Sequence, residues 1–187
     1  ARSIGAGGRE VTRSAPSLWN VGFLNKYFWD GRAHSLEEQM QGPLYADNEM
    51  GNTPENLLIT LNAISAYRRL FNVAFDTDQI TLEHIYTAIG AFESSLISLN
   101  SRYDRYAHGH HAALSDKEIE GMNVFRSFVA RCAECHTPPL FTNQQIAVIG
   151  TPEPEGLPRD IGAQALEDDA SRRGGFRVPS LRNIVKT

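Results

Sequence analysis

Two thiols and one imidazole are the most reactive side chains that this sequence places close together. Cys132 and Cys135 are separated by two residues, and His136 follows directly. Two thiols at this spacing can add across the vinyl groups of a haem, and an imidazole immediately after them can ligate the iron. The run Cys-Ala-Glu-Cys-His therefore predicts covalent attachment of haem c, with His136 as an iron ligand.

Two other chemistries also use paired cysteines. A structural zinc site needs four ligands, and the chain has only two cysteines. The remaining ligands would be carboxylates or histidines, of which the nearest cluster is His108, His110 and His111. A thioredoxin-like dithiol favours a βαβ setting, whereas the pattern before Cys132 is helical. Haem is the favoured hypothesis, and a structural metal-binding module is a distant alternative.

The elements that must position the motif are predicted to be helices. Ser35 should cap a short helix that ends at Gly42-Pro43. Thr53-Pro54 should start a second helix, with apolar residues at helical spacing as far as Leu70 and Phe71. The fold class is therefore mainly α.

Later segments continue the helical pattern. A helix should start near Thr81, and Ser115–Glu118 fits a capping box whose helix should run directly into Cys132. Residues 100–114 are polar and should join two domains, and residues 151–175 should form a long loop. The expected apolar face of the helix after Thr81 is Leu82, Ile85, Ile89, Phe92 and Leu96.

Composition excludes some partners. The net charge is −4 and 21% of residues are charged, which is not the basic footprint of a nucleic-acid binder. No run of apolar residues is long enough to cross a membrane. With 41% hydrophobic residues, the chain can bury a core.

Several short segments carry a more specific signal. They are Ala15–Asn20, Phe28–Ala33, Ser35–Gln39, Gly42-Pro43, Glu49-Met50, Ala88–Glu93 and Pro179–Asn183. In sequence and spacing they resemble the di-haem cytochrome c peroxidase family, which includes MauG-like enzymes. The Phe-Trp-Asp-Gly-Arg-Ala run is the most specific part, with Gln39 ten residues after Trp29 and Glu49 ten residues after that.

The resemblance implies two cytochrome c-like haem domains packed side by side, each incomplete in this chain. Residues 1–99 would belong to the domain where peroxide reacts. Residues 100–187 would form the electron-entry domain that carries the Cys-x-x-Cys-His motif. The family has a second such motif upstream and a distal Met or Tyr ligand further on, so we expect one covalent haem here and two in the full protein.

The resemblance also assigns roles to single residues. Trp29 would pass electrons between the haems, while Gln39, Pro43 and Glu49 would line the peroxide pocket. These types suit the chemistry, since a carboxylate can move a proton, an amide can orient peroxide and an indole can carry an electron. The structural alternatives are a core tryptophan, a helix-ending proline and solvent-facing polar side chains.

Further expectations concern the haem surroundings and calcium. Phe176 and Arg177 are candidate haem contacts, the arginine through a propionate. Calcium would bind between the domains, where Ser14 takes the place of an asparagine ligand and Thr187 that of a carbonyl donor.

One departure from the family concerns the peroxide site. Many members carry a loop histidine that blocks the peroxide haem, and Ala6 stands at that position in Ser3–Gly8. Because alanine cannot ligate iron, we expect this haem to be open without prior reduction.

The leading hypothesis is a periplasmic enzyme that reduces hydrogen peroxide to water, with electrons from a small cytochrome c or cupredoxin. A homodimer remains open as a further partner. One alternative is MauG-like oxidation of a protein substrate. Another is a non-catalytic electron-transfer cytochrome.

Overall fold

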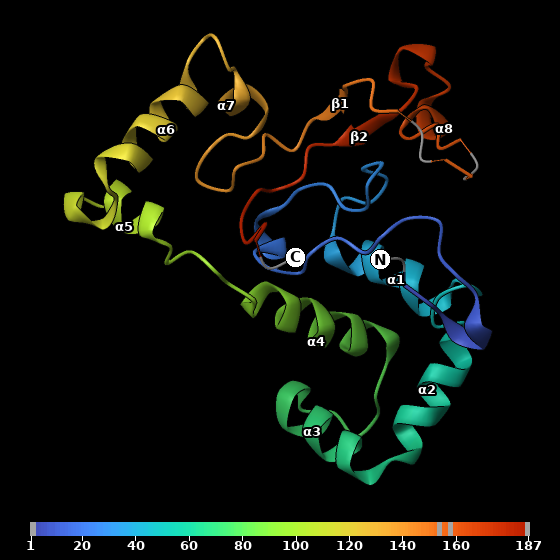
Figure 1. Cartoon of the computed structure of the whole chain (residues 1–187). Coiled ribbons are helices and arrows are strands. Elements are labelled where there is room, and N and C mark those ends of the chain that lie inside the picture. Colours follow the sequence, from blue (N-terminus) through green and yellow to red (C-terminus); the bar gives the residue numbers. More distant parts are fainter. Residues whose placement is uncertain (1–2, 153–154, 157–158, 186–187) are drawn as a thin grey trace. The chain divides into compact units, whose positions relative to one another are not determined.

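The computed structural model describes residues 3–152, 155–156 and 159–185, and most of its regular structure is helical (Figure 1). The α-helices are α1 Leu36–Tyr45, α2 Pro54–Ala63, α3 Ser65–Phe75, α4 Leu82–Ser95, α5 Arg102–Ala107, α6 Asp116–Arg126, α7 Cys132–Cys135 and α8 Gln164–Glu167. Short 3₁₀ turns cover Ala6–Gly8, Val21–Phe23, His111–Ala113 and Ala170–Arg172. Strand β1 Ile146–Val148 pairs antiparallel with β2 Gly175–Arg177. The predicted mainly α class is confirmed.

The chain divides into two compact units. The first comprises Ala1–Ser17 and Ala33–Ser95, and the second comprises Leu18–Arg32 and Leu96–Thr187. The excursion of Leu18–Arg32 into the second unit has no counterpart in the expected domain ranges. The assignment of residues 1–99 and 100–187 to two haem domains stays a prediction.

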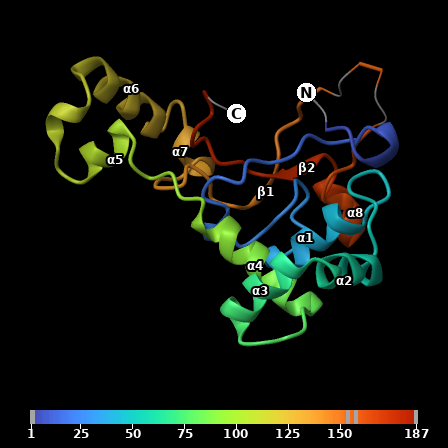
Figure 2. The ribbon, with the colours of Figure 1, turned by 90° about the horizontal axis from the view of Figure 1, so that it is seen from below.

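The first unit is built from α1 packed on α4 and α2 packed on α3 (Figure 2). Both predicted caps are present, since Ser35 Oγ accepts from Glu38 N and Thr53 Oγ1 from Asn56 N, each at 3.1 Å. Each bond satisfies a helix N–H that has no partner inside the helix. The buried apolar residues of this unit are Ala33, Leu36, Met40, Leu44, Ile80 and Ile85.

Two expected helix boundaries in this unit are wrong. Helix α1 continues through Pro43 to Tyr45 and closes with a bond from Ala46 N to Gly42 O. A proline so near the end disrupts little of the remaining ladder, which explains why the helix survives it. The expected single helix after Thr53 is two helices, because Ile64 leaves helical geometry between α2 and α3.

The apolar face of α4 also differs from the expected one. Ile85 is buried, but Phe92 is 62% exposed, and the small or polar residues Gly90 and Glu93 are buried instead. Gly90 leaves room at its surface for Glu37, whose Oε1 lies 3.1 Å from the position of a Cβ there. The buried face of α4 is the face that contacts α1. The spacing of apolar residues alone could not predict which face this is.

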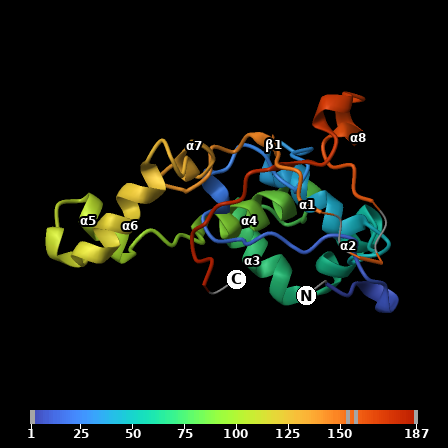
Figure 3. The ribbon, with the colours of Figure 1, turned by 45° about the horizontal axis from the view of Figure 1, so that its top comes forward.

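The second unit places α6 beside α7, as Figure 3 shows. The predicted capping box is present, with Glu118 Oε2 accepting from Ser115 N and Oγ, both at 2.8 Å. The helix nevertheless ends at Arg126, and a turn separates it from the new helix that starts at Cys132. Residues 100–114 are likewise not a plain linker, since they form α5 and a 3₁₀ turn.

Within the described residues, no helix is long and apolar enough to cross a membrane. The expected long loop at residues 151–175 contains α8 and a 3₁₀ turn in its described part. The buried apolar residues of the second unit are Val21, Tyr27, Ala163 and Val178.

Glu93 is a buried carboxylate of the first unit without a complete set of partners. It is 9% exposed, and its Oε2 has no hydrogen bond to any described residue. Burial raises the pKa of Glu93, and the nearby Glu37 carboxylate raises it further. The folded state therefore holds the proton more tightly than the unfolded state, so the stability due to this group falls as pH rises above its unfolded pKa.

Replacing Glu93 with Gln should remove this pH-dependent loss. The melting temperature of E93Q minus that of wild type should increase as pH is raised from about 4.5 toward 7, measured on the full-length holoprotein. The matched control is E83Q, at an exposed position of the same helix. A difference that is flat with pH, or that shrinks, would show that Glu93 is ionised without penalty in the folded protein.

Candidate functional site

Helix α7 is a single turn, and each of its backbone carbonyls accepts a hydrogen bond. Arg131 starts it with a positive φ of 55°. The acceptors and donors are Cys132 O with His136 N, Ala133 O with Thr137 Oγ1, Glu134 O with Asn143 Nδ2, and Cys135 O with Asn143 N. Carbonyls at a helix end have no partner inside the helix, so Thr137 and Asn143 stabilise a turn that is too short to hold itself.

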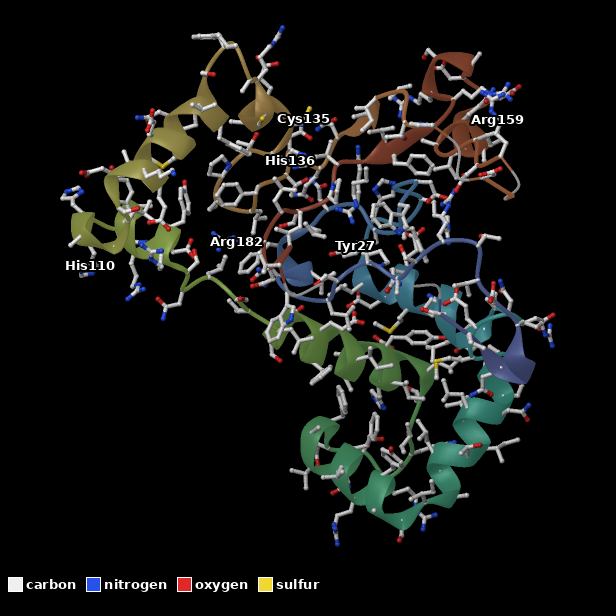
Figure 4. All side chains as sticks on the ribbon, viewed as in Figure 1. Tyr27, His110, Cys135, His136, Arg159 and Arg182 are labelled. Carbon is white, nitrogen blue, oxygen red and sulfur yellow. The ribbon has the colours of Figure 1, made fainter. Side chains whose placement is uncertain are left out.

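This turn presents the predicted attachment residues together. Cys132 and Cys135 are free thiols at its two ends, and both are partly exposed. His136 follows as the C-cap. Figure 4 shows Cys135 and His136 at this turn, with Arg182 on the C-terminal segment of the same unit. The two thiols are therefore available for bonds to a ligand outside the chain.

The His136 ring is held in one orientation by the loop that follows. Its Nδ1 lies 3.1 Å from the carbonyl oxygen of Phe141. A carbonyl can only accept, so Nδ1 must carry the proton, and the neutral ring keeps its lone pair on Nε2. Metal-ligating histidines typically make this bond with the nitrogen that does not bind the metal. Nε2 is therefore the nitrogen through which His136 could bind a metal.

Unsatisfied donors test whether this unit fits a haem. Arg177 is 5% exposed, and burial lowers the pKa of its guanidinium. Its Nη1 and the Nδ2 of Asn183 are buried without a hydrogen-bond partner among the described residues. Such groups cost free energy unless a partner is supplied. The propionate carboxylates of a haem are acceptors of the kind that both groups lack, so the residues fit the group.

Exposed apolar side chains precede the motif. Phe128 and Val129 are each 94% exposed, and Val124 on α6 is 57% exposed. Large apolar side chains that are this exposed are suited to contact with another apolar group. A porphyrin is mostly apolar, so this surface is a second observation that fits a haem.

The metal alternative receives no support from the described part of the chain. No group of three or more His, Cys, Asp and Glu residues there could hold a metal ion. His108 Nδ1 instead lies 2.7 Å from Asp104 O, and the His111 ring packs edge-on against Tyr106. His108 and His111 thus have local partners that do not involve the cysteines.

The residues expected around peroxide lie in the first unit. Gln39 and Pro43 are on α1, and Glu49 is in the turn that follows. That turn folds back on the helix end, since Met50 N donates to Pro43 O at 3.0 Å and Glu49 N to Ala46 O at 2.9 Å. All three predicted side chains are partly exposed.

The segment with Ala6 lies against this turn. Ala6 N donates to Glu49 O at 2.6 Å, and the Ala6 Cβ is 3.6 Å from the Cβ position of Gly51. A Cβ on Gly5 would lie 2.1 Å from Asn48 O, so only glycine permits this approach. The loop and the Glu49 turn are therefore one packed structure.

Trp29 and Phe176 lie in the second unit, with the attachment residues. The carbonyl of Trp29 accepts from Arg177 N at 2.7 Å, and Arg177 Nε donates to Phe28 O at 3.3 Å. Phe176 is half-buried on β2. The expected calcium ligands are not brought together by any described contact, because Ser14 is an exposed residue of the first unit and Thr187 lies outside the described residues.

Sequence reasoning missed Phe141 and Asn143, which hold the motif through a backbone carbonyl and an amide. A carbonyl acceptor leaves no mark in the sequence, because every residue has one. Arg182 was part of the Pro179–Asn183 segment that carried the resemblance, but it had no assigned role. Its ion pair with Asp104, at 2.6 Å, joins residues far apart in the chain.

Comparison with known proteins gives matches along the whole chain. A family model described as di-haem cytochrome c peroxidase matches residues 1–112. The cytochrome c551 peroxidase of Nitrosomonas europaea is 33% identical over 186 residues, which cover 99% of this chain and 55% of that protein. The methylamine utilization protein MauG of Methylophilus methylotrophus is 34% identical over 175 residues, or 92% of this chain and 51% of that protein.

A solved structure agrees with these matches. The crystal structure of a MauG-like protein associated with microbial copper homeostasis superposes with a TM-score of 0.83 at 32% identity, and the match covers 98% of this chain and 59% of that one. The chain thus spans about half the length of the curated relatives it matches. The family that the sequence resembled is confirmed, and this family implies haem c as the cofactor: the chain belongs to the di-haem cytochrome c peroxidase family.

Proposed function

We propose that the full protein is a periplasmic peroxidase that reduces hydrogen peroxide to water, with electrons from a small cytochrome c or cupredoxin that reach the reaction site through Trp29. The observation that carries the proposal is the attachment turn, with two free thiols and a histidine whose Nδ1 is committed to Phe141 O. Covalent haem attachment takes place outside the cytoplasm, which is why the periplasm is proposed.

Haem c on Cys132, Cys135 and His136 would supply a one-electron redox centre to the second unit. The chain's own part is to fix that centre. The thiols of Cys132 and Cys135 would hold the ring, His136 would ligate the iron through Nε2, and Arg177 and Asn183 would donate hydrogen bonds to the propionates. Phe176 on the neighbouring strand is a further apolar contact. A second haem would be held by residues outside this sequence.

The peroxide chemistry is proposed for the first unit. Cleavage of an O–O bond needs a proton moved between its oxygens, and a carboxylate can do this. Glu49 is the candidate, with Gln39 to orient peroxide and Pro43 to shape the pocket. The packing of Ala6 on Glu49 supports the expectation that the loop lies beside the pocket, with no side chain at position 6 that could block an iron.

The role of Trp29 as an electron relay is supported by its backbone hydrogen bond within the second unit, which also carries Cys132, Cys135 and His136. Its carbonyl accepts from Arg177 N, and the next residue, Val178, offers its carbonyl to Thr142 Oγ1 at 2.5 Å. Thr142 adjoins Phe141, which accepts from His136. A short chain of covalent and hydrogen bonds therefore connects Trp29 with the iron ligand.

Oxidation of a protein substrate is the second candidate. Ala6 favours this candidate, because MauG-like family members also lack the blocking histidine. The MauG protein of Methylophilus methylotrophus is 34% identical to this chain. Peroxide would be the oxidant in both candidates. Calcium at Ser14 and assembly into a homodimer remain subsidiary proposals.

The first prediction tests haem attachment. The double variant C132A/C135A should lose one covalent haem from the full protein, because no thiol remains to form the thioethers. Intact mass and the pyridine haemochrome spectrum measure this. The exposed neighbour Glu134 provides the control E134Q, which should keep its haem. Zinc in place of haem in the wild type would overturn the proposal.

The second prediction concerns Glu49. In stopped-flow mixing of oxidised enzyme with peroxide, E49Q should react about 10²–10⁴ times more slowly, the usual effect of losing acid–base catalysis. This corresponds to about 3 kcal/mol or more of transition-state stabilisation. Because Glu49 is partly exposed, the melting temperature should change little. The control is E83Q in the same unit, and equal rates for E49Q and wild type would remove Glu49 from proton transfer.

The third prediction concerns Trp29. W29F should slow steady-state turnover at least tenfold while leaving the haem content and the direct reaction with peroxide unchanged, because the ring that carries the electron is lost. W19F is the control, since Trp19 is a half-exposed tryptophan of the same unit. Unchanged turnover in W29F would leave Trp29 a packing role only.

A further inference from the structure

Three successive carbonyls of the loop after the attachment turn are held by three successive residues near the C-terminus. The loop residues are Pro139–Phe141 and the donors are Ser180–Arg182, so the two segments run alongside each other. The bonds are Arg182 Nε to Pro139 O at 2.7 Å, Ser180 Oγ to Leu140 O at 2.6 Å and Leu181 N to Phe141 O at 3.3 Å. The last acceptor, the carbonyl of Phe141, also accepts the hydrogen bond from His136 Nδ1.

Arg182 is itself anchored by Asp104. Its Nη1 and Nη2 donate to the two carboxylate oxygens at 2.8 and 2.6 Å, and the side chains are only 6% and 9% exposed. Ser101 N and Oγ donate to the same carboxylate at 2.8 and 2.7 Å. The Arg182 bonds hold the pKa of Asp104 well below its usual range, so the carboxylate stays charged. A buried, two-pronged ion pair of this kind fixes direction as well as distance.

Phe141 has little freedom to turn its carbonyl away. Its φ is 55°, in the left-handed region, and its ring packs edge-on against Tyr103 at 4.9 Å between centroids. The Arg182 guanidinium carbon lies 5.6 Å from the same ring. The Phe141 ring is therefore in contact with the Arg182 side chain that Asp104 anchors. The Phe141 carbonyl is bound by the backbone N–H of Leu181, the residue before Arg182.

We propose that the Asp104–Arg182 pair is a positioning unit, which holds the Phe141 carbonyl on His136 Nδ1 and thereby sets how strongly His136 donates electrons to the haem iron. The inference rests on the proposed attachment of haem at Cys132 and Cys135. A hydrogen bond from Nδ1–H to a carbonyl raises the basicity of a ligating imidazole. A more basic ligand favours the oxidised iron, so the intact network lowers the midpoint potential of this haem.

The charge of Arg182 also acts directly on the midpoint potential of the haem. Loss of this charge changes the potential in the opposite direction to loss of the positioning effect. Removing the positive Arg182 alone stabilises oxidised iron by Coulomb's law and would lower the potential. Loosening the Phe141 carbonyl would raise it. The variant D104N/R182Q removes one charge of each sign, so its net charge equals that of wild type and the two Coulomb effects oppose each other.

The experiment is spectroelectrochemical titration of the full-length holoprotein. At a fixed applied potential, D104N/R182Q should increase the reduced-to-oxidised ratio of the electron-entry haem at least threefold, equivalent to ~28 mV for a one-electron couple. The control R102Q breaks an exposed two-pronged pair with Glu118 nearby, and it should leave the ratio within experimental error. An unchanged or decreased ratio in the double variant overturns the inference.

A conservative variant keeps the test decisive if the double variant does not fold. R182K keeps the charge but cannot reproduce the planar fork that joins Asp104 and Pro139. It should shift the ratio in the same direction by a smaller factor, and an unchanged ratio would overturn the inference. Absence of covalent haem from wild type would instead contradict the proposed function. A haem-loaded double variant with the wild-type potential contradicts only the role of Asp104 and Arg182.

Discussion

A hydrogen bond to one nitrogen of an imidazole fixes the tautomer and the direction in which the other nitrogen can bind a metal. Here the carbonyl of Phe141 accepts a hydrogen bond from Nδ1–H of His136, which leaves the lone pair on Nε2 free. The carbonyl is in turn shared with Leu181 N and flanked by carbonyls bound to Ser180 and Arg182. The order of the attachment turn therefore depends on a segment more than 40 positions away in the chain.

Both units contain buried polar atoms without a hydrogen-bond partner among the described residues. Arg177 and Asn183 in the second unit and Glu93 in the first each bury an atom that makes no hydrogen bond within the described residues. Native proteins contain few such groups, because each costs free energy on folding. In the second unit the missing partners are acceptors, which agrees with a cofactor that carries carboxylates and with membership of a haem-binding family.

In the first unit, backbone hydrogen bonds hold a polar turn at the end of a short helix. The turn with Glu49 bonds back to α1 and accepts from Ala6, and the close approach needs a glycine at position 5. Backbone groups do most of this work, so side chains such as Glu49 and Gln39 remain available. A site whose scaffold is held by backbone bonds can present reactive side chains without using them for stability.

The sequence by itself determined the attachment motif, the mainly α class, the helix starts at Ser35, Thr53 and Ser115, and the family. These features are local, since a cap or a Cys-x-x-Cys-His run lies within a few consecutive residues. Tertiary structure decided where helices stopped, as at Ile64 and Arg126, and which face of α4 was buried.

Tertiary structure also decided what holds His136, the proposed iron ligand. Asp104, Phe141 and Arg182 come from three separate segments, and their bonds exist only after the chain has folded. Neither a backbone acceptor nor a long-range ion pair has a spacing that a sequence pattern could reveal. The chemistry of the motif could therefore be predicted from its residue types, whereas the orientation of the His136 ring depends on contacts between distant residues.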